Sequence, residues 1–268
     1  MKKIIIPLLV ALAVAACGQP DSEPAAQEPA AKAAPAAVDP AVYAAAVANP
    51  ARPEADRERD AGRQPAAVLE FLQVAPGMRV LDLFSGGGYY AEILAAVVGA
   101  DGHVVAHSNQ AYLNFVGDEF AARYAEGRLP NVEVLMAENN ELELAANQFD
   151  AITIVLAYHD TYWVSPENGW PAVDRPQLLA ELYGALKPGG FVAVVDHQAV
   201  PGSPGETGGT VHRIDRAVVI ADFEQAGFVL DGESDLLHNP DDNHELGVFD
   251  PAIRGKTDRF ILRFRKPQ

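Results

Sequence analysis

The feature that most constrains the fold is an alternation of helix-like and strand-like segments that begins after Pro65. Strand-like runs such as Arg79–Phe84 and Ala151–Tyr158 alternate with segments whose apolar residues recur at helical spacing, for example Tyr89–Val98. This alternation is typical of a parallel sheet covered by helices on both faces. The sequence therefore predicts an α/β fold with seven strands. The run Ala151–Tyr158 is expected at the centre because it is apolar and therefore suited to burial on both faces.

The end of the chain breaks this alternation. The last two strand-like runs, Val229–Leu237 and Arg259–Arg265, have no helix between them. Consecutive strands without a crossover helix pair antiparallel. We therefore expect a Rossmann-like, mostly parallel sheet with an antiparallel last strand. The polar insertion 239–256 is a candidate lid, with Asp241 and Asp242 expected at its solvated surface.

The chain begins with two lysines, an apolar run and its only cysteine, Cys17. The run is too short to span a bilayer, which needs about 20 apolar residues, so residues 1–16 are predicted to be a cleaved signal peptide. Residues 14–17 resemble a bacterial lipobox, which implies a diacylglycerol on Cys17. We expect the chain to be membrane-anchored only through this lipid, facing the periplasm from the outer membrane. The alternative is a cytoplasmic chain whose signal is not used.

Residues 17–65 are dominated by Ala, Pro, Glu and Asp and contain few bulky apolar side chains. Burying so little apolar surface does not offset the entropy lost on ordering the backbone. We therefore interpret 17–65 as an Ala/Pro-rich tether and 66–268 as the folded domain. An alternative for the charged segment Arg52–Arg63 is that it folds back over the opening of the domain.

The formal net charge of the chain is -17, and no Lys/Arg-rich stretch offsets it. A phosphate backbone would repel such a chain, so nucleic acid is excluded as a partner. A small-molecule substrate is expected instead.

The run VLDLFSGGG at residues 80–88 lies where the first strand turns into a helix. Gly86 and Gly88 permit positive φ angles and the close approach of a ligand, while N–H groups at the helix start can bind a carboxylate. Taken alone, Gly86, Gly88 and Ala91 also match the G-x-G-x-x-A pattern of nicotinamide-dinucleotide sites.

Three motifs in the correct order together resemble class I S-adenosylmethionine-dependent methyltransferases. They are the glycine run, the segment Asn131–Val134 followed by Glu138, and the turn Leu186–Phe191 before a fifth strand. The resemblance implies S-adenosylmethionine as the cofactor, with Asp82, Gly86 and Gly88 around its amino-acid part and Glu138 on the adenine amino group.

Two positions depart from the family's pattern. Phe84 stands where the family usually has its first glycine, which would narrow or redirect the binding site. The ribose-binding acid is missing after the second strand, where the sequence is His107-Ser108-Asn109. Ser108 or Asn109 is the expected replacement, and losing a charge-assisted hydrogen bond predicts cofactor binding weaker by about 1 kcal/mol.

Ligands of open α/β sheets bind at the carboxyl ends of the strands. There, His159 and Asp160 follow the fourth strand and His197 follows the fifth. A hydroxyl or protonated amine must lose a proton before methylation, so His159 or His197 is the candidate base and Asp160 its partner. With His212, these residues are a conceivable metal set, but they lack a compact spacing motif and no metal site is predicted.

The sequence thus predicts an S-adenosylmethionine-dependent methyltransferase acting on an unidentified small molecule. Export conflicts with this activity, because the cofactor is not made outside the cytoplasm. The alternative is a non-catalytic envelope binding module that kept the fold, which Phe84 and the missing acid favour. A dehydrogenase is disfavoured by the antiparallel ending and by the turn Lys187–Gly190.

Overall fold

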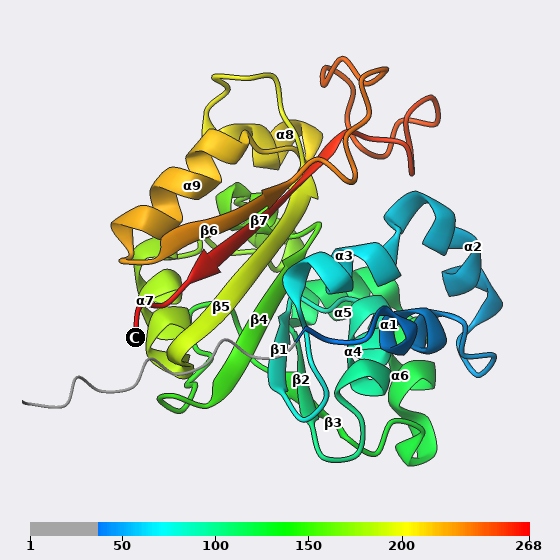
Figure 1. Cartoon of the computed structure of the whole chain (residues 1–268). Coiled ribbons are helices and arrows are strands. Elements are labelled where there is room, and N and C mark those ends of the chain that lie inside the picture. The colour runs from blue at the N-terminus through cyan, green and yellow to red at the C-terminus, as the bar shows by residue number, and fades with distance from the viewer. Residues whose placement is uncertain (1–36) are drawn as a thin grey trace, which may run out of the picture. The chain divides into compact units, whose positions relative to one another are not determined.

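A computed structural model describes residues 37–268, which build a seven-stranded sheet in the order β3-β2-β1-β4-β5-β7-β6 (Figure 1). The first five strands are parallel to one another, and β7 is antiparallel to both β5 and β6. The predicted fold class, the central fourth strand and the antiparallel ending are therefore confirmed. The strands are β1 Arg79–Leu83, β2 His103–Ser108, β3 Val132–Met136, β4 Phe149–Val155, β5 Leu186–His197, β6 Val229–Ser234 and β7 Arg259–Arg265.

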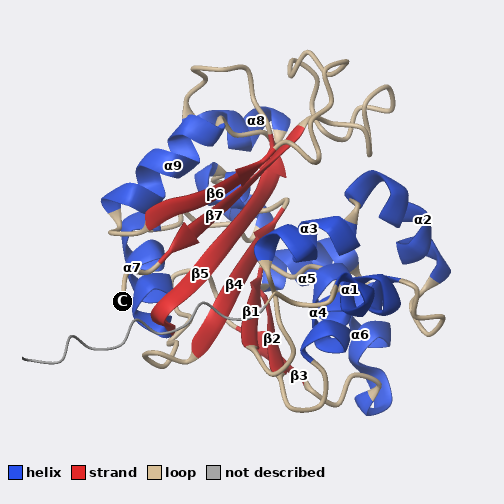
Figure 2. Ribbon diagram, viewed as in Figure 1, coloured by secondary structure: helices blue, strands red, loops and turns tan. Residues whose placement is uncertain are grey.

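Helices cover both faces of this sheet (Figure 2). They are α1 Pro40–Val47, α2 Glu54–Arg63, α3 Pro65–Leu72, α4 Tyr89–Val98, α5 Gln110–Val116, α6 Asp118–Tyr124, α7 Arg175–Ala185, α8 Gly208–Val211 and α9 Arg216–Gln225. Short 3-10 turns lie between them, among them η2 Tyr158–Tyr162. Helices α5 and α6 are separated by Gly117, whose φ of 56° ends α5.

The side chains of each strand alternate between two apolar clusters, as the pleat of a strand requires. Along β1, Leu81 and Leu83 join the cluster beneath α7 and α9, whereas Val80 joins the cluster beneath α1, α3 and α4. All three side chains are fully buried. Burial on both faces leaves only the ends of the strands free to carry polar groups, so the functional residues are confined to those ends.

The fourth strand is shorter than predicted at its carboxyl end. The sequence predicted a strand over Ala151–Tyr158, but β4 ends at Val155 and Leu156 adopts a left-handed backbone with a φ of 56°. The chain then enters η2, which contains His159 and Asp160. The turn therefore lifts these two residues out of the sheet at the end where ligands bind.

Residues 37–65, predicted as part of the tether, instead form α1 and α2, which pack on the body. Tyr43 is 1% exposed, and its hydroxyl donates a hydrogen bond of 2.9 Å to the carbonyl of Val74. In α2, the buried Asp56 forms an ion pair of 2.7 Å with Arg123. The prediction was wrong because it counted only bulky apolar residues, whereas small alanines allow close packing and buried ion pairs hold the charged segment.

The predicted signal peptide 1–16 and the lipidated Cys17 lie outside the residues that the structure describes. The lipid anchor therefore stays a prediction. Over residues 37–268, no helix combines the length and the apolar character needed to cross a bilayer.

Replacing Tyr43 with Ala tests whether α1 belongs to the folded body. Truncating a buried aromatic residue leaves a cavity and removes apolar contacts, so we expect a loss of about 3 kcal/mol in the free energy of unfolding, measured by urea denaturation. Tyr43→Phe, which removes only the hydroxyl, should cost about 1 kcal/mol. A Tyr43→Ala variant as stable as the parent would show that α1 is not packed.

Candidate functional site

A cavity of about 1130 Å³ opens at the carboxyl ends of β4 and β5. The predicted lid contributes Phe249 and Arg254, and α2 contributes Arg59 and Arg63. The insertion lies beyond the arrowhead of β5 in Figure 1. The charged segment Arg52–Arg63 thus folds over the opening, as the alternative interpretation proposed. The remaining wall has aromatic and polar parts, which include Tyr112, Phe115, Trp163, Trp170, His159, Asp160, His197, His212, Thr257 and Arg259.

His159 is held by Asp196, a fully buried residue near the end of β5. One carboxylate oxygen of Asp196 accepts a 2.9 Å hydrogen bond from the backbone N–H of His159, and the other lies 2.7 Å from Nδ1 of its ring. Burial alone would lower the pKa of His159, but the charges of Asp160 and Asp196 raise it to about 9. The imidazole is therefore protonated at neutral pH, which argues against its predicted role as a free base.

Asp160 lies at the centre of the polar wall. Its Oδ1 is 3.3 Å from Nε2 of His159 and 3.2 Å from Nδ1 of His212, and its Oδ2 accepts a 2.6 Å hydrogen bond from Tyr112. Burial opposes ionisation, yet the positive His159 and the hydrogen bonds from His212 and Tyr112 lower the pKa of Asp160. Ligand atoms of His159, Asp160 and His212 lie within 4.8 Å of one another, so these three can hold a metal ion.

His197, the third predicted catalytic residue, also lines the cavity but has different partners. Its Nδ1 is 2.7 Å from Oγ1 of Thr257, and its ring centre is 5.9 Å from that of His159. Burial, followed by the nearby positive charges of His159 and Arg259, lowers the pKa of His197 well below its usual range. The structure therefore brings His159, Asp160 and His197 to one wall and leaves His197 neutral.

His212 reaches this wall because α8 packs tightly on η2. A Cβ at Gly208 would lie only 2.2 Å from the carbonyl oxygen of His159, so glycine alone permits this approach. Helix α8 then ends at His212, whose φ of 55° is unusual for a residue with a side chain.

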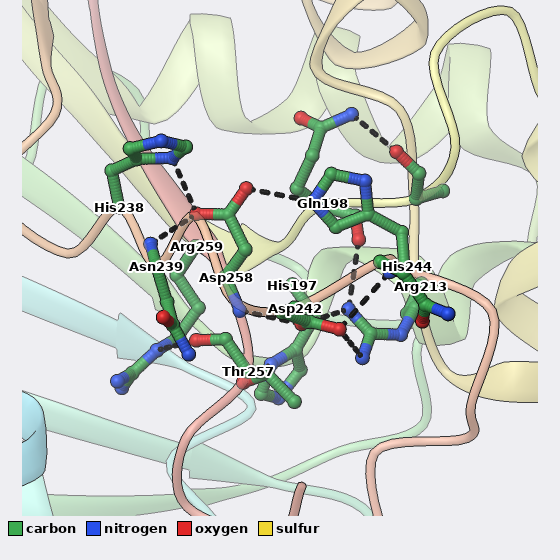
Figure 3. A network of polar contacts seen from close by, with 12 residues as sticks. His197, Gln198, Arg213, His238, Asn239, Asp242, His244, Thr257, Asp258 and Arg259 are labelled. Atoms are coloured by element: carbon green, nitrogen blue, oxygen red, sulfur yellow. Dashed lines mark hydrogen bonds and ion pairs between the residues drawn. The ribbon is translucent and has the colours of Figure 1, made fainter.

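The next residue, Arg213, fixes this segment from the other side (Figure 3). Its buried guanidinium donates two hydrogen bonds, of 2.9 and 3.1 Å, to Asp242 and a third to the carbonyl of Gln198. The prediction that Asp242 is solvated was wrong, since it is 5% exposed. Asp242 is buried because the guanidinium of Arg213 is buried, and a buried charge requires a partner of opposite charge. Asp241 is exposed, as predicted.

The predicted cofactor residues of the glycine run lie between β1 and α4. Gly86 and Gly88 have φ angles of 56° and 79°, so the turn uses the backbone freedom of glycine. Asp82 is buried, and its Oδ1 accepts a 2.8 Å hydrogen bond from Thr153. Its Oδ2 and the hydroxyl of Ser85 are buried without a hydrogen-bond partner among the described residues.

Buried polar atoms without a hydrogen-bond partner in the described part of the chain also lie at the ends of β2 and β3. Ser108 is fully buried, and its hydroxyl lacks a hydrogen-bond partner within residues 37–268. Glu138 accepts a long, 3.4 Å hydrogen bond from the backbone N–H of Gln110. Asn139 bonds Asn109, but its own amide nitrogen is unpartnered in the same part of the chain. Unpartnered buried polar atoms are costly, so this row of atoms fits a ligand that carries amino and hydroxyl groups, as S-adenosylmethionine does.

Aromatic side chains separate this row from the cavity. The ring of Phe84 lies 5.8 Å from that of Tyr112 and 6.1 Å from that of Trp170, and the last two line the cavity. Asp82 and Ser108 do not line it. Phe84 has a φ of 57°. Its ring lies between the polar row and the cavity and so narrows the binding site, as expected for a phenylalanine where the family usually has a glycine.

Several residues of the site were missed by the sequence interpretation. Tyr112 and Arg259 face the cavity, and Asn139 joins the polar row. Only Arg259 had a usable signal, since it begins a strand beside the fifth one. Tyr112 had no such signal in the sequence, because its position in the cavity wall depends on how helix α5 packs at the end of the sheet.

Comparison with known sequences shows that part of the chain is similar to methyltransferases. The model of the protein-L-isoaspartate(D-aspartate) O-methyltransferase family matches residues 44–160. The chain is 30% identical over 138 residues to a demethylmenaquinone methyltransferase of Listeria monocytogenes, covering 52% of each chain. It is 31% identical over 122 residues to a ubiquinone/menaquinone biosynthesis C-methyltransferase of Vibrio cholerae, covering 45% of this chain and 42% of that one. The chain thus spans about half the length of the curated relatives it matches.

Comparison with solved structures supports the same fold. A methyltransferase dependent on S-adenosylmethionine from Aquifex aeolicus superimposes with a TM-score of 0.56 at 22% identity. The match covers 85% of this chain and 99% of the other. At this identity the likeness establishes the fold and leaves the reaction and the substrate open.

The buried Asp82 should give the free chain a measurable pH dependence of stability. Burial raises the pKa of Asp82 to about 6, whereas an unfolded Asp has a pKa near 3.9. The folded state therefore holds a proton that the unfolded state releases, and stability falls as the pH rises from about 4 to 6. Asp82→Asn should remove a fall on the order of 2 to 3 kcal/mol, measured by urea unfolding across this range. The exposed Asp101→Asn is the control, and identical pH profiles for both variants would contradict the assignment.

Proposed function

Because the chain has the fold of class I S-adenosylmethionine-dependent methyltransferases and resembles methyltransferases in sequence over about half of its length, we propose that it methylates a small aromatic molecule. One observation carries the proposal: a row of unpartnered buried polar atoms at the ends of β1, β2 and β3 lies next to a large cavity at the ends of β4 and β5. The row of polar atoms can bind the cofactor, and the cavity can hold the methyl acceptor.

In this proposal the cofactor is held by the residues of the polar row. Asp82 lies beneath the turn formed by Gly86 and Gly88 and binds the amino-acid part of the cofactor. Ser108 faces the ribose, and Glu138 faces the adenine. When bound, S-adenosylmethionine supplies an electrophilic methyl group. Because Ser108 forms no charge-assisted hydrogen bond, we expect weaker binding than in relatives with an acid at this position.

The cavity wall indicates the chemistry of the acceptor. Trp163 and Phe249 offer flat apolar surfaces that stack on a planar ring. Arg63 and Arg259 also line the cavity, and neither forms an ion pair with a carboxylate of residues 37–268. Guanidinium groups without a carboxylate partner favour an acceptor with an acidic oxygen. Two relatives have names that refer to quinone methylation, which agrees with an aromatic acceptor of this kind.

The histidines at the end of the sheet would handle the acceptor's polar group. His159 and Asp160 follow β4, and His197 ends β5, so all three face the cavity. His197 bonds Thr257 through Nδ1, which leaves its Nε2 for a proton of the acceptor. We assign proton uptake to His197 and acceptor orientation to His159 and Asp160, because His159 is already engaged by two carboxylates.

A second candidate function is a non-catalytic binding module. The observation that favours it is the contact of Phe84 with Tyr112 and Trp170, which separates the polar row from the cavity. Such a module would bind its ligand in the cavity and leave the polar row empty.

Cofactor binding tests the two functions directly. Titration calorimetry of the full chain with S-adenosylmethionine and S-adenosylhomocysteine should show one site for each ligand. Asp82→Ala should weaken both by at least tenfold because it removes the buried carboxylate beneath the glycine turn. His197→Ala is the matched variant on the acceptor side and should keep cofactor affinity. An absence of binding by either ligand at millimolar concentration would sink the methyltransferase proposal and leave the binding module.

We also propose that the mature chain is anchored to the bacterial envelope through acylated Cys17, which the lipobox-like sequence at 14–17 supports. Several acyl chains on one residue give stable membrane attachment, whereas one chain gives only marginal attachment. Cys17→Ser should therefore move the protein from the membrane pellet to the soluble fraction after cell fractionation. Equal membrane association of both forms would contradict the anchor and reopen the cytoplasmic alternative.

A further inference from the structure

The polar wall of the cavity has the spacing of a metal site. In a tetrahedral zinc site with bonds of about 2.0–2.1 Å, neighbouring ligand atoms lie about 3.3 Å apart. Oδ1 of Asp160 is 3.3 Å from Nε2 of His159 and 3.2 Å from Nδ1 of His212. The ligand atoms of all three residues lie within 4.8 Å of one another. The two imidazoles and the carboxylate can therefore share one ion after a small movement, with the ion replacing the proton on Nε2 of His159.

The partners of these ligands match those found around metal ions. A metal-binding histidine usually donates its other ring N–H to a carboxylate, which orients the ring and makes the ligating nitrogen more basic. Nδ1 of His159 lies 2.7 Å from the buried Asp196 in this manner. The second oxygen of Asp160 accepts a hydrogen bond from Tyr112, which leaves Oδ1 as the free ligand atom.

The three ligands also lie on a rigid support. His159 and Asp160 sit in η2, and the backbone of His159 is bonded by Asp196. His212 is fixed by the close approach of Gly208 on one side and by the buried Arg213 on the other. His212 has a left-handed backbone, and holding a residue with a side chain in that conformation costs free energy. Strained residues of this kind are commonly found at functional sites.

We propose that His159, Asp160 and His212 bind one divalent transition-metal ion at the wall of the cavity. Two imidazoles and one carboxylate suit zinc or a neighbouring first-row metal, whereas magnesium and calcium prefer oxygen ligands only. Three protein ligands leave a coordination position open, and all three residues line the cavity, so that position faces the acceptor. Asp160 and the adjacent Asp196 supply two negative charges against the dication.

The inference goes beyond methyl transfer and does not depend on it. Where the proposed function also holds, the ion would bind an acidic oxygen of the acceptor and favour its deprotonated form. His197 bonds Thr257 and is outside the ligand set, so it would remain available for the proton.

Titration of the metal-free full chain tests the site. The chain would carry Cys17→Ser so that its only thiol cannot bind metal, and the probes would be zinc, cobalt and magnesium chlorides. We expect one zinc per chain by calorimetry and a visible absorption band with cobalt typical of four ligands. His212→Ala and Asp160→Asn should each lower zinc affinity by at least tenfold, and Asp196→Asn should lower it by about 10- to 100-fold through His159.

His238→Ala is the matched control. His238 also bonds an aspartate, at 2.9 Å from Asp258 (Figure 3), but it does not line the cavity. It should keep the affinity of the parent. Binding of S-adenosylhomocysteine, measured on the same variants, reports separately on the methyltransferase proposal and on folding. Zinc binding that is absent, equal in His212→Ala, or replaced by magnesium would overturn the metal site, and the three residues would then be a hydrogen-bonded cluster only.

Discussion

The carboxylate of Asp196 is the interaction on which the site depends. It is fully buried at the end of β5, where both faces of the sheet are covered, and it bonds the backbone and ring of His159 and the backbone N–H of His197. A buried carboxylate is tolerated only with such partners. The carboxylate of Asp196 therefore links the ends of β4 and β5. It also orients the ring of His159 toward Asp160. This arrangement couples the central sheet to the polar wall of the cavity.

Tyr112 connects the two halves of the site. Its ring contacts Phe84 above the glycine turn, while its hydroxyl bonds Asp160 on the cavity wall. A ligand that displaces the ring on one side therefore releases a hydrogen bond on the other. Coupling of this kind requires a contiguous set of contacts, and here a single side chain supplies it. The aromatic group of Phe84, Tyr112 and Trp170 is thus both the barrier between the polar row and the cavity and the link between them.

The sequence predicted the sheet, its central strand and its antiparallel ending because these follow from apolar patterning and from the absence of a last crossover helix. It also predicted that His159, Asp160 and His197 share one wall, since the ends of parallel strands meet. It did not predict the partner of Arg213 or the position of His212, because both depend on the path of the insertion. The packing of α1 was missed, and that of α2 was given only as an alternative, because small side chains and buried ion pairs leave no strong apolar pattern.

We propose that the polar row at the ends of β1, β2 and β3 binds S-adenosylmethionine. The most direct test is a crystal structure of the full chain with S-adenosylhomocysteine. We expect the ligand against Asp82 and Ser108, with the rings of Phe84 and Tyr112 shifted from their present contact. A structure in which those rings are unmoved and the ligand is absent, or lies only in the cavity among the aromatic side chains, would contradict it.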